Sequence, residues 1–216
     1  MSLNENMPRR KTVLASGEYY HIFNRGVNHT PIFLSVRDYK RFLKTVLYYQ
    51  GQEVKPRYSF YNPNIHNFTG KGKLVEIIAY CLMPNHFHFL LKQTIDKGIE
   101  NFVRKSTNSY TKYFNIKNKR IGPLFQGRFQ SVHIETNEQL LHLSRYIHLN
   151  PIVSYVARDL ESYEWSSFKD YFSNLNICSK DVILKQFKSA EDYKNFLLDQ
   201  ENYAKELELI KHQLLD

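Results

Sequence analysis

Two histidines separated by one residue, in His86-Phe87-His88, form the first pattern in the sequence that could carry chemistry. On a β-strand, residues i and i+2 point to the same face, so both imidazoles would lie together and Phe87 would point into the core. Two imidazoles one pleat apart can bind a single divalent metal ion. The alternative is a pair of half-buried histidines beside a sheet, and the pattern alone fits both.

A tyrosine and an asparagine four residues apart, Tyr146 and Asn150, form the second pattern. Near the end of a predicted helix, positions i and i+4 lie about 6 Å apart on one face. If the amide oxygen of Asn150 binds a metal ion, the Tyr146 hydroxyl can lie beside the same ion. The structural alternatives are a core tyrosine with a solvated hydroxyl and, for Asn150, a C-terminal helix cap before Pro151.

The middle of the chain is basic. Residues 97–135 contain eight Lys or Arg and two Glu, and the whole chain has a formal charge of +9. A solvated helix face is the usual fate of such a run, but the one-sided sign favours contact with phosphate groups. Aromatic residues make up 15% of the chain, and aromatic faces beside Lys and Arg can hold unpaired bases by stacking. The alternative is that the aromatic residues mostly form the core, which is the expectation for the Phe residues. Together the charge and the aromatic content favour a polyanion partner such as a nucleic acid.

Alternating strands and helices must position these residues. Apolar patterns predict strands over 19–25, 74–82, 86–92 and 129–135, and helices over 35–50, 97–115 and 136–149. Met83-Pro84-Asn85 predicts the turn of an antiparallel hairpin, and Ser35 and Thr136 are expected N-caps. A loop is expected over 57–73, and a short helix over 162–172. The predicted fold class is α+β, a small antiparallel sheet covered by helices.

Length and composition bound the organisation of the chain. We expect a disordered lead-in over 1–15, one folded domain over 16–172 and a helical C-terminal extension over 173–216. No apolar run approaches the length of a membrane span, and the basic N-terminus lacks the apolar segment of a secretory signal. The chain has only two cysteines, Cys81 and Cys178, which excludes a disulfide framework and favours a cytoplasmic location.

Taken together, several motifs resemble the HUH tyrosine transposases and, within them, the REP-associated tyrosine transposases of the IS200-like family. The resemblance extends from about Tyr19 to Phe168, and the tail has no counterpart. The matching segments are Asn24-Arg25-Gly26, 82–88 (LMPNHFH), 109–115 (SYTKYFN), 122–128 (GPLFQGR), 145–151 (RYIHLNP) and Trp165-Ser166-Ser167.

The resemblance implies a ferredoxin-like or RRM-like sheet with the histidine pair on a central strand. It assigns Tyr146 as the nucleophile, and His86, His88 and Asn150 as ligands of a divalent ion, Mg or Mn. Some relatives have Gln at the position of Asn150. Tyr110 and Tyr113 are rival tyrosines, ranked lower because the residues at i+4 from them, Phe114 and Lys117, are not of ligand type.

The implied activity is a metal-dependent single-strand DNA endonuclease and strand-transferase that forms a 5′-phosphotyrosine intermediate. The expected partner is single-stranded DNA with a hairpin of the REP type, bound by a monomer or homodimer. The expected DNA-binding residues are Arg25, Arg104, Lys105, Lys112, Arg120, Arg128 and Arg145. The alternatives are a non-catalytic RRM-like binding protein, a two-histidine hydrolase in which water attacks the phosphate, and a domesticated transposase.

Overall fold

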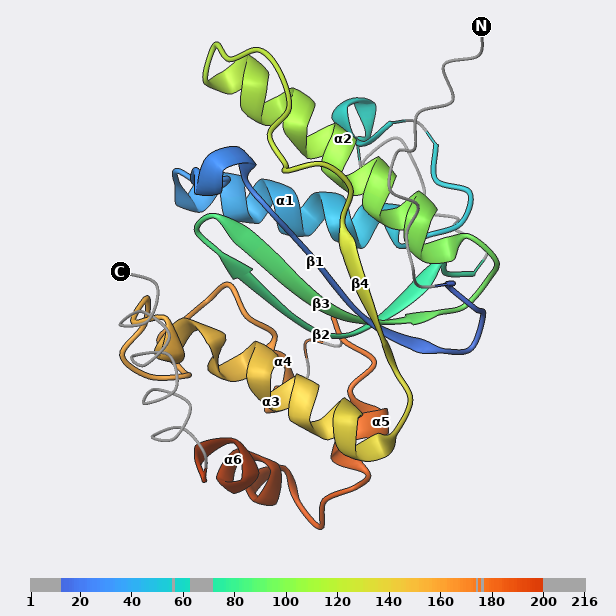
Figure 1. Ribbon diagram of the computed structural model, residues 1–216, viewed down its shortest axis with the longest axis vertical. Coiled ribbons are helices and arrows are strands. Elements are labelled where there is room, and N and C mark those ends of the chain that lie inside the picture. The colour runs from blue at the N-terminus through green and yellow to red at the C-terminus, as the bar shows by residue number, and fades with distance from the viewer. Residues whose placement is uncertain (1–12, 56, 63–71, 174, 176, 200–216) are drawn as a thin grey trace, which may run out of the picture.

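A four-stranded antiparallel sheet, covered by helices on both faces, forms the centre of the protein (Figure 1). The computed structural model describes residues 13–55, 57–62, 72–173, 175 and 177–199. Most of the expected lead-in, much of the expected loop over 57–73 and the end of the C-terminal extension therefore lie outside the described residues.

The strands are β1 (Tyr19–Arg25), β2 (Val75–Met83), β3 (His86–Gln93) and β4 (Gln130–Ile134). They lie in the order β2-β3-β1-β4, and each neighbouring pair is antiparallel. With one helix between β1 and β2 and another between β3 and β4, this is the ferredoxin-like arrangement. The predicted fold class is confirmed, and β3 is a central strand as expected.

One face of the sheet is covered by α1 (Val36–Tyr49) and α2 (Gly98–Lys117). Buried aromatic rings fill the space between these helices and the sheet. The ring centroid of Phe42 on α1 lies 5.5 Å from that of Phe87, and Phe102 on α2 lies 6.2 Å from Phe89. Because Phe87 and Phe89 point into this core, the residues that alternate with them on β3 must point to the other face.

The other face is covered by α3 (Asn137–Val153), which packs on β2 and β3. Its N-cap is Thr136, as predicted, whose side chain accepts a hydrogen bond from the backbone N–H of Gln139. The prediction that Pro151 ends the helix is wrong, because α3 continues to Val153. Pro151 lies in the last turn, where it removes one backbone donor, and burial of Pro151 and Ile152 keeps this turn helical.

In the C-terminal part, the segment around residues 165–171 packs along β2, while the last two helices pack against α3. This part contains α4 (Phe168–Tyr171), α5 (Asp181–Leu184) and α6 (Ala190–Leu198). Two short 3-10 turns, Val27–His29 and Tyr58–Phe60, lie in the N-terminal part of the chain. The short helix expected over 162–172 is confined to the four residues of α4. None of the helices in the described ranges has the length and apolar character needed to cross a membrane.

A buried polar chain joins α6 to α3. The Tyr193 hydroxyl lies 2.9 Å from Nδ1 of His148 and donates to Oγ of Ser144 at 3.1 Å. Nε2 of His148 lies 2.8 Å from Oγ of Ser167. Burial lowers the pKa of His148 to about 3, so its ring is neutral in this cluster.

Replacing Tyr193 with phenylalanine is expected to lower the free energy of unfolding by about 1–3 kcal/mol. The reason is that Nδ1 of His148 and Oγ of Ser144 each lose a buried hydrogen-bond partner. Urea denaturation followed by circular dichroism measures the change. The control is Tyr155→Phe, which removes a hydroxyl from a side chain that is 59% exposed. Equal effects of the two substitutions would contradict a stabilising role for the polar chain.

Candidate functional site

The two histidines of β3 lie side by side on the face of the sheet that α3 covers. His86 pairs with Arg25 and His88 with Phe23 across the β1–β3 ladder. The centroids of the two imidazole rings are 4.9 Å apart. This arrangement follows from strand alternation, with Phe87 on the opposite face, as the sequence pattern predicts.

Helix α3 brings Tyr146 to this pair. The centroid of the Tyr146 ring lies 5.4 Å from that of His88 and 6.0 Å from that of His21 on β1. The Tyr146 side chain is 47% exposed, so it borders the site and remains open to a large substrate. A phenol therefore lies beside the histidine pair at the surface of the protein.

Asn150 lies one helical turn after Tyr146 and is buried. Its side-chain oxygen Oδ1 forms no hydrogen bond of regular geometry among the described residues, although the side chain lies close enough to His86 to raise the pKa of that imidazole. A buried oxygen with incomplete hydrogen bonding is costly, and it marks a place where a ligand can supply the missing interaction. The helix-cap alternative fails, because α3 continues beyond Asn150 and only its backbone oxygen accepts a bond, from Ser154 N.

Burial keeps the imidazoles of the site neutral. The pKa of His86 is lowered by burial, while the contact with Asn150 raises it and the charge of Arg25 lowers it. The pKa of His88 is lowered by burial and by His21 and His86, and burial lowers the pKa of His21 to about 4. Neutral imidazoles keep the nitrogen lone pairs that metal binding requires.

These residues fit a divalent ion with a mixed ligand set. Among the described residues, no group of three or more His, Cys, Asp or Glu side chains is arranged to hold a metal. A site here would instead combine two imidazole nitrogens with the amide oxygen of Asn150. The observation that favours this fit is the buried Oδ1 of Asn150, which lacks a regular hydrogen bond and whose side chain contacts His86, the neighbour of His88.

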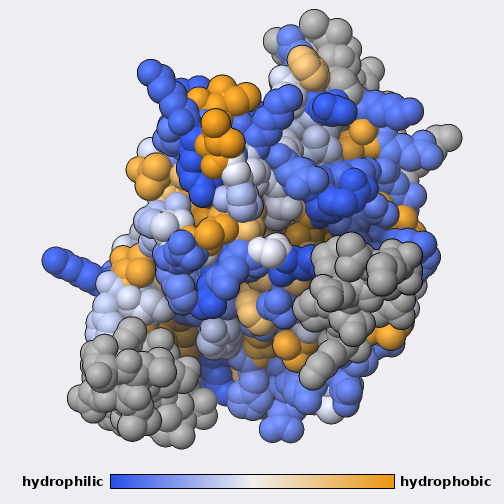
Figure 2. All heavy atoms as spheres, turned by 45° about the horizontal axis from the view of Figure 1, so that its top comes forward, coloured by the Kyte–Doolittle hydropathy of each residue, from blue (hydrophilic) through white to orange (hydrophobic). Residues whose placement is uncertain are grey.

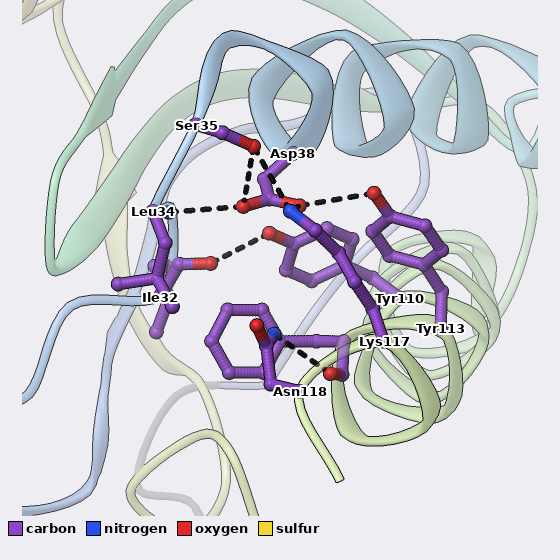
Figure 3. Close-up of polar contacts among 9 residues, drawn as sticks. Ile32, Leu34, Ser35, Asp38, Tyr110, Tyr113, Lys117 and Asn118 are labelled. Carbon is purple, nitrogen blue, oxygen red and sulfur yellow. Dashed lines mark hydrogen bonds and ion pairs between the residues drawn. The ribbon is translucent and has the colours of Figure 1, made fainter.

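The rival tyrosines on α2 have structural contacts (Figure 3). Tyr110 is fully buried, and its hydroxyl donates to the Ile32 carbonyl oxygen at 2.6 Å. The Tyr113 hydroxyl donates to Asp38 at 3.0 Å, and Lys117 donates to the same carboxylate oxygen at 2.6 Å. Both rings therefore connect α2 to the segment around α1, on the face of the sheet opposite to the histidine pair.

The basic residues expected on α2 border a groove between α1 and α2. The groove has a volume of about 930 Å³, and seven of its lining residues besides Lys117 are cationic. They are Arg37, Arg41, Lys55, Arg57, Arg104, Lys105 and Lys112. Figure 2 turns this layer toward the viewer, and hydrophilic side chains dominate the face that it shows. Sequence reasoning did not select the four of these residues that lie in 37–57 as DNA-binding residues, although their charges are visible in the sequence.

The remaining predicted DNA-binding arginines lie in different environments. Arg25 is exposed next to His86 and donates to Gln126 at 2.7 Å. Arg128 is also exposed and lines a second hollow, of about 600 Å³, together with Arg104. Arg120 connects Asn115 to the Pro123 carbonyl oxygen, and so supports the loop that follows α2.

Arg145 is buried beneath α6, with only 6% of its surface exposed. Its guanidinium carbon lies 3.9 Å from the centroid of the Phe196 ring, and Nη1 donates to the Phe196 carbonyl oxygen at 3.0 Å. A side chain held in this way is not available to a phosphate group. The prediction that Arg145 contacts DNA therefore has no support from its position, and we omit it from the proposed interface.

Two residues that sequence reasoning did not select contact the histidine pair directly. Nε2 of His21 lies 2.9 Å from Nδ1 of His88, and Oδ1 of Asn85 lies 2.6 Å from Nδ1 of His86. Asn85 was interpreted as a turn residue and as part of the matching segment 82–88, with no role at the site. His21 shares the face of His88 because both alternate with core residues, which is a signal that strand parity could have provided.

Two comparisons with known proteins found similarities to this chain. Residues 52–150 match the model of the family described as transposase IS200 like, and this segment contains His86, His88, Tyr146 and Asn150. A solved structure, described as the REP-associated tyrosine transposase bound to a REP hairpin, has a TM-score of 0.59 to this chain. The match covers 78% of this chain and 87% of that chain at 15% sequence identity, which establishes a shared fold. No curated protein sequence matches. Residues 52–150 thus resemble the IS200-like transposases, and the chain shares the fold of the solved transposase structure.

Proposed function

We propose that this protein is a divalent-metal-dependent single-strand DNA nickase and strand-transferase, with Tyr146 as its nucleophile. The observation that supports this most is the meeting of a half-exposed phenol, two neutral imidazoles and a buried amide oxygen without a regular hydrogen bond, from β3 and α3. All four side chains come from one chain, which supports a monomer as the functional unit.

The proposed reaction exchanges one phosphodiester for another. The Tyr146 oxygen attacks phosphorus, the bond between phosphorus and the 3′ oxygen breaks, and a 5′-phosphotyrosine forms. The phenol loses its proton, and the departing 3′ oxygen gains one. Because the phosphotyrosine linkage conserves the energy of the broken phosphodiester bond, a second 3′-hydroxyl can reverse the step and join strands. Hydrolysis by water would not allow this rejoining.

His86, His88 and Asn150 would hold the metal ion in this proposal, and Mg or Mn suits a mixed set of nitrogen and oxygen ligands. When bound, the ion supplies positive charge that offsets the charge of the phosphate oxygens. The protein contributes the neutral state of both imidazoles and a fixed position for the amide oxygen. Helix α3 contributes the phenol of Tyr146, which lies beside His88.

The proposed substrate is a DNA hairpin with an unpaired flank. The groove between α1 and α2 carries the charge to bind the backbone of the stem. Arg104 and Asn108 line both this groove and the hollow of about 600 Å³, which Asn24 also lines. Asn24 and Arg25 are consecutive on β1 and point to opposite faces, so an unpaired strand can pass there toward His86.

A hairpin oligonucleotide with a labelled unpaired flank tests this function when it is incubated with the protein and Mn²⁺. We expect a denaturant-resistant adduct together with a released fragment that ends in a 3′-hydroxyl. Cleavage without an adduct would instead support a hydrolase that uses water. Binding without cleavage under all metal conditions would support the non-catalytic RRM-like alternative.

Replacing Lys105 and Lys112 together with alanine is expected to flatten the salt dependence of hairpin binding. Each lost phosphate contact makes the negative slope of log K against log salt shallower by about 0.7–0.9. The slope of the double variant should therefore be shallower by about 1.4–1.8. Fluorescence anisotropy over a salt series measures this slope.

The matched control for the salt experiment is the double substitution of Lys185 and Lys188 with alanine. Both side chains are exposed, and they lie in the C-terminal part of the chain. The control changes the net charge equally but should keep the wild-type slope. Equal slopes for the two double variants would remove the groove from the proposed interface.

A further inference from the structure

The side chain of Asn85 lies between a backbone carbonyl and the ring of His86. Its Nδ2 donates to the carbonyl oxygen of His29 at 3.2 Å, and its Oδ1 lies 2.6 Å from Nδ1 of His86. Only the NH₂ group of an amide can donate to a carbonyl oxygen. The contact with His29 therefore fixes which end of the amide faces His86, and this end is the oxygen.

This orientation determines the tautomer of His86. Oδ1 can only accept, so Nδ1 of a neutral His86 must carry the hydrogen. The lone pair then lies on Nε2, the nitrogen on the far side of the ring from Asn85. An imidazole binds a metal through the nitrogen that carries no hydrogen, and the hydrogen bond made by the other nitrogen selects it.

The backbone holds Asn85 in this position. Gly26 N donates to the Asn85 carbonyl oxygen at 2.8 Å, and Ile32 N donates to the Pro84 carbonyl oxygen at 2.8 Å. A Cβ atom on Gly26 would lie 2.1 Å from the Thr30 carbonyl oxygen, so only glycine permits this approach. The segment that presents the His29 carbonyl is thus connected to the hairpin turn independently of the Asn85 side chain.

The second imidazole has a similar partner. Nδ1 of His88 lies 2.9 Å from Nε2 of His21, and the two rings are stacked with centroids 5.1 Å apart. If His21 accepts this bond, the hydrogen of His88 is on Nδ1 and its lone pair is on Nε2. Both histidines of β3 would then present the same nitrogen, each with its Nδ1 occupied by a neighbour.

We propose that Asn85 and His21 are positioning residues that hold His86 and His88 in the Nδ1–H tautomer, so that both Nε2 atoms are available to one divalent ion. This proposal rests on the proposed function, because it concerns the same metal site. It adds two residues to the site and assigns each a specific hydrogen bond. Neither residue contacts the phosphate in this account.

Long-range ¹H–¹⁵N correlation spectra of the histidine rings test the proposal in the metal-free full-length chain. In the wild type we expect His86 and His88 in the Nδ1–H tautomer. Asn85→Ala should shift His86 toward the Nε2–H form, whereas Asn85→Asp, which keeps an acceptor oxygen, should retain Nδ1–H. An Nε2–H form of His86 in the wild type, or an unchanged tautomer in Asn85→Ala, would overturn the assignment of Asn85.

The His21 half of the proposal has its own pair of variants. His21→Leu should remove the preference of His88 for the Nδ1–H tautomer. His21→Gln, whose amide oxygen can still accept a hydrogen bond, should preserve that tautomer. These spectra require neither metal nor DNA, so they can fail while the adduct assay for the proposed function succeeds, and the reverse is also possible. An unchanged His88 spectrum in His21→Leu would exclude His21 as the positioning partner.

Binding of Mn²⁺, measured by titration calorimetry, provides the second readout. Loss of such a supporting hydrogen bond typically weakens metal binding about 10–100-fold, and we expect this for Asn85→Ala and His21→Leu. Asn118→Ala is the matched control, because it removes a hydrogen bond that a side-chain amide donates to the Phe114 carbonyl oxygen at the end of α2. Wild-type affinity in Asn85→Ala, or an equal loss in Asn118→Ala, would contradict the proposal.

Discussion

Replacing Tyr146 with phenylalanine is expected to abolish the covalent protein–DNA adduct, lowering the cleavage rate by at least about 10³-fold. The substitution removes only the attacking oxygen and keeps the ring that packs beside His88 and His21. Affinity for the hairpin should stay within about twofold of wild type, because the proposed phosphate contacts lie on other elements. A denaturing gel of labelled oligonucleotide reports the adduct, and anisotropy reports the affinity.

The matched control for this substitution is Tyr113→Phe. Its hydroxyl donates to Asp38, which also accepts bonds from Lys117, Ser35 and the backbone N–H of Leu34. Burial opposes ionisation of Asp38, but these bonds outweigh burial and lower its pKa, so the carboxylate remains paired when one of them is lost. Tyr113→Phe should therefore form the adduct. A Tyr146→Phe protein that still formed it would end the assignment of the nucleophile.

Replacing His86 with alanine is expected to remove metal-dependent cleavage, with a loss on the order of 10²–10⁴-fold at limiting Mn²⁺. Two imidazoles and one amide oxygen are the whole proposed ligand set, so the loss of one imidazole leaves too few groups to hold the ion. Calorimetry should show weakened Mn²⁺ binding in parallel with the loss of cleavage. Activity of the wild type in excess chelator would refute the role of the metal.

His133→Ala is the control for the histidine substitution. His133 is also a strand residue, but it lies on the edge strand β4, and its Nε2 contacts Glu18 at 3.0 Å. Its loss should leave both Mn²⁺ binding and cleavage close to wild type. If His133→Ala and His86→Ala behaved alike, the effect of the latter would reflect general disruption of the sheet.

Much of the site could be predicted from short-range periodicity. Strand alternation with period two places His86 and His88 together and Phe87 opposite, and a helical turn separates Tyr146 from Asn150. The ferredoxin-like sheet follows from the order of the elements. The assignment of roles came from the resemblance to a family, since an H-x-H pattern alone does not distinguish ligands from half-buried histidines.

The contacts around the histidine pair depend on chain segments that meet only in the folded protein. Asn85 orients His86 because the His29 carbonyl lies against the hairpin turn, and no local pattern indicates that contact. His21 reaches His88 because β1 pairs with β3 in one particular register. Local propensity identifies a turn at Asn85 but does not identify the partner of its side chain.

Charge alone did not indicate how each basic side chain is packed, and proline did not mark the end of α3. Arg145 and Arg120 are as basic as any residue of the groove, yet one is buried against Phe196 and the other supports a loop. Residue type gives charge, while burial depends on packing between elements distant in sequence. Pro151 predicted the end of α3, and packing of the following residue extended the helix instead.

Tandem mass spectrometry of the adduct tests the central claim most directly. The protein is incubated with a single-stranded hairpin substrate and Mn²⁺, digested with nuclease and protease, and the modified peptide is sequenced. We predict one peptide carrying a nucleotide 5′-phosphate on the oxygen of Tyr146. A phosphate on Tyr110 or Tyr113, or cleaved DNA with no modified peptide at all, would contradict this account.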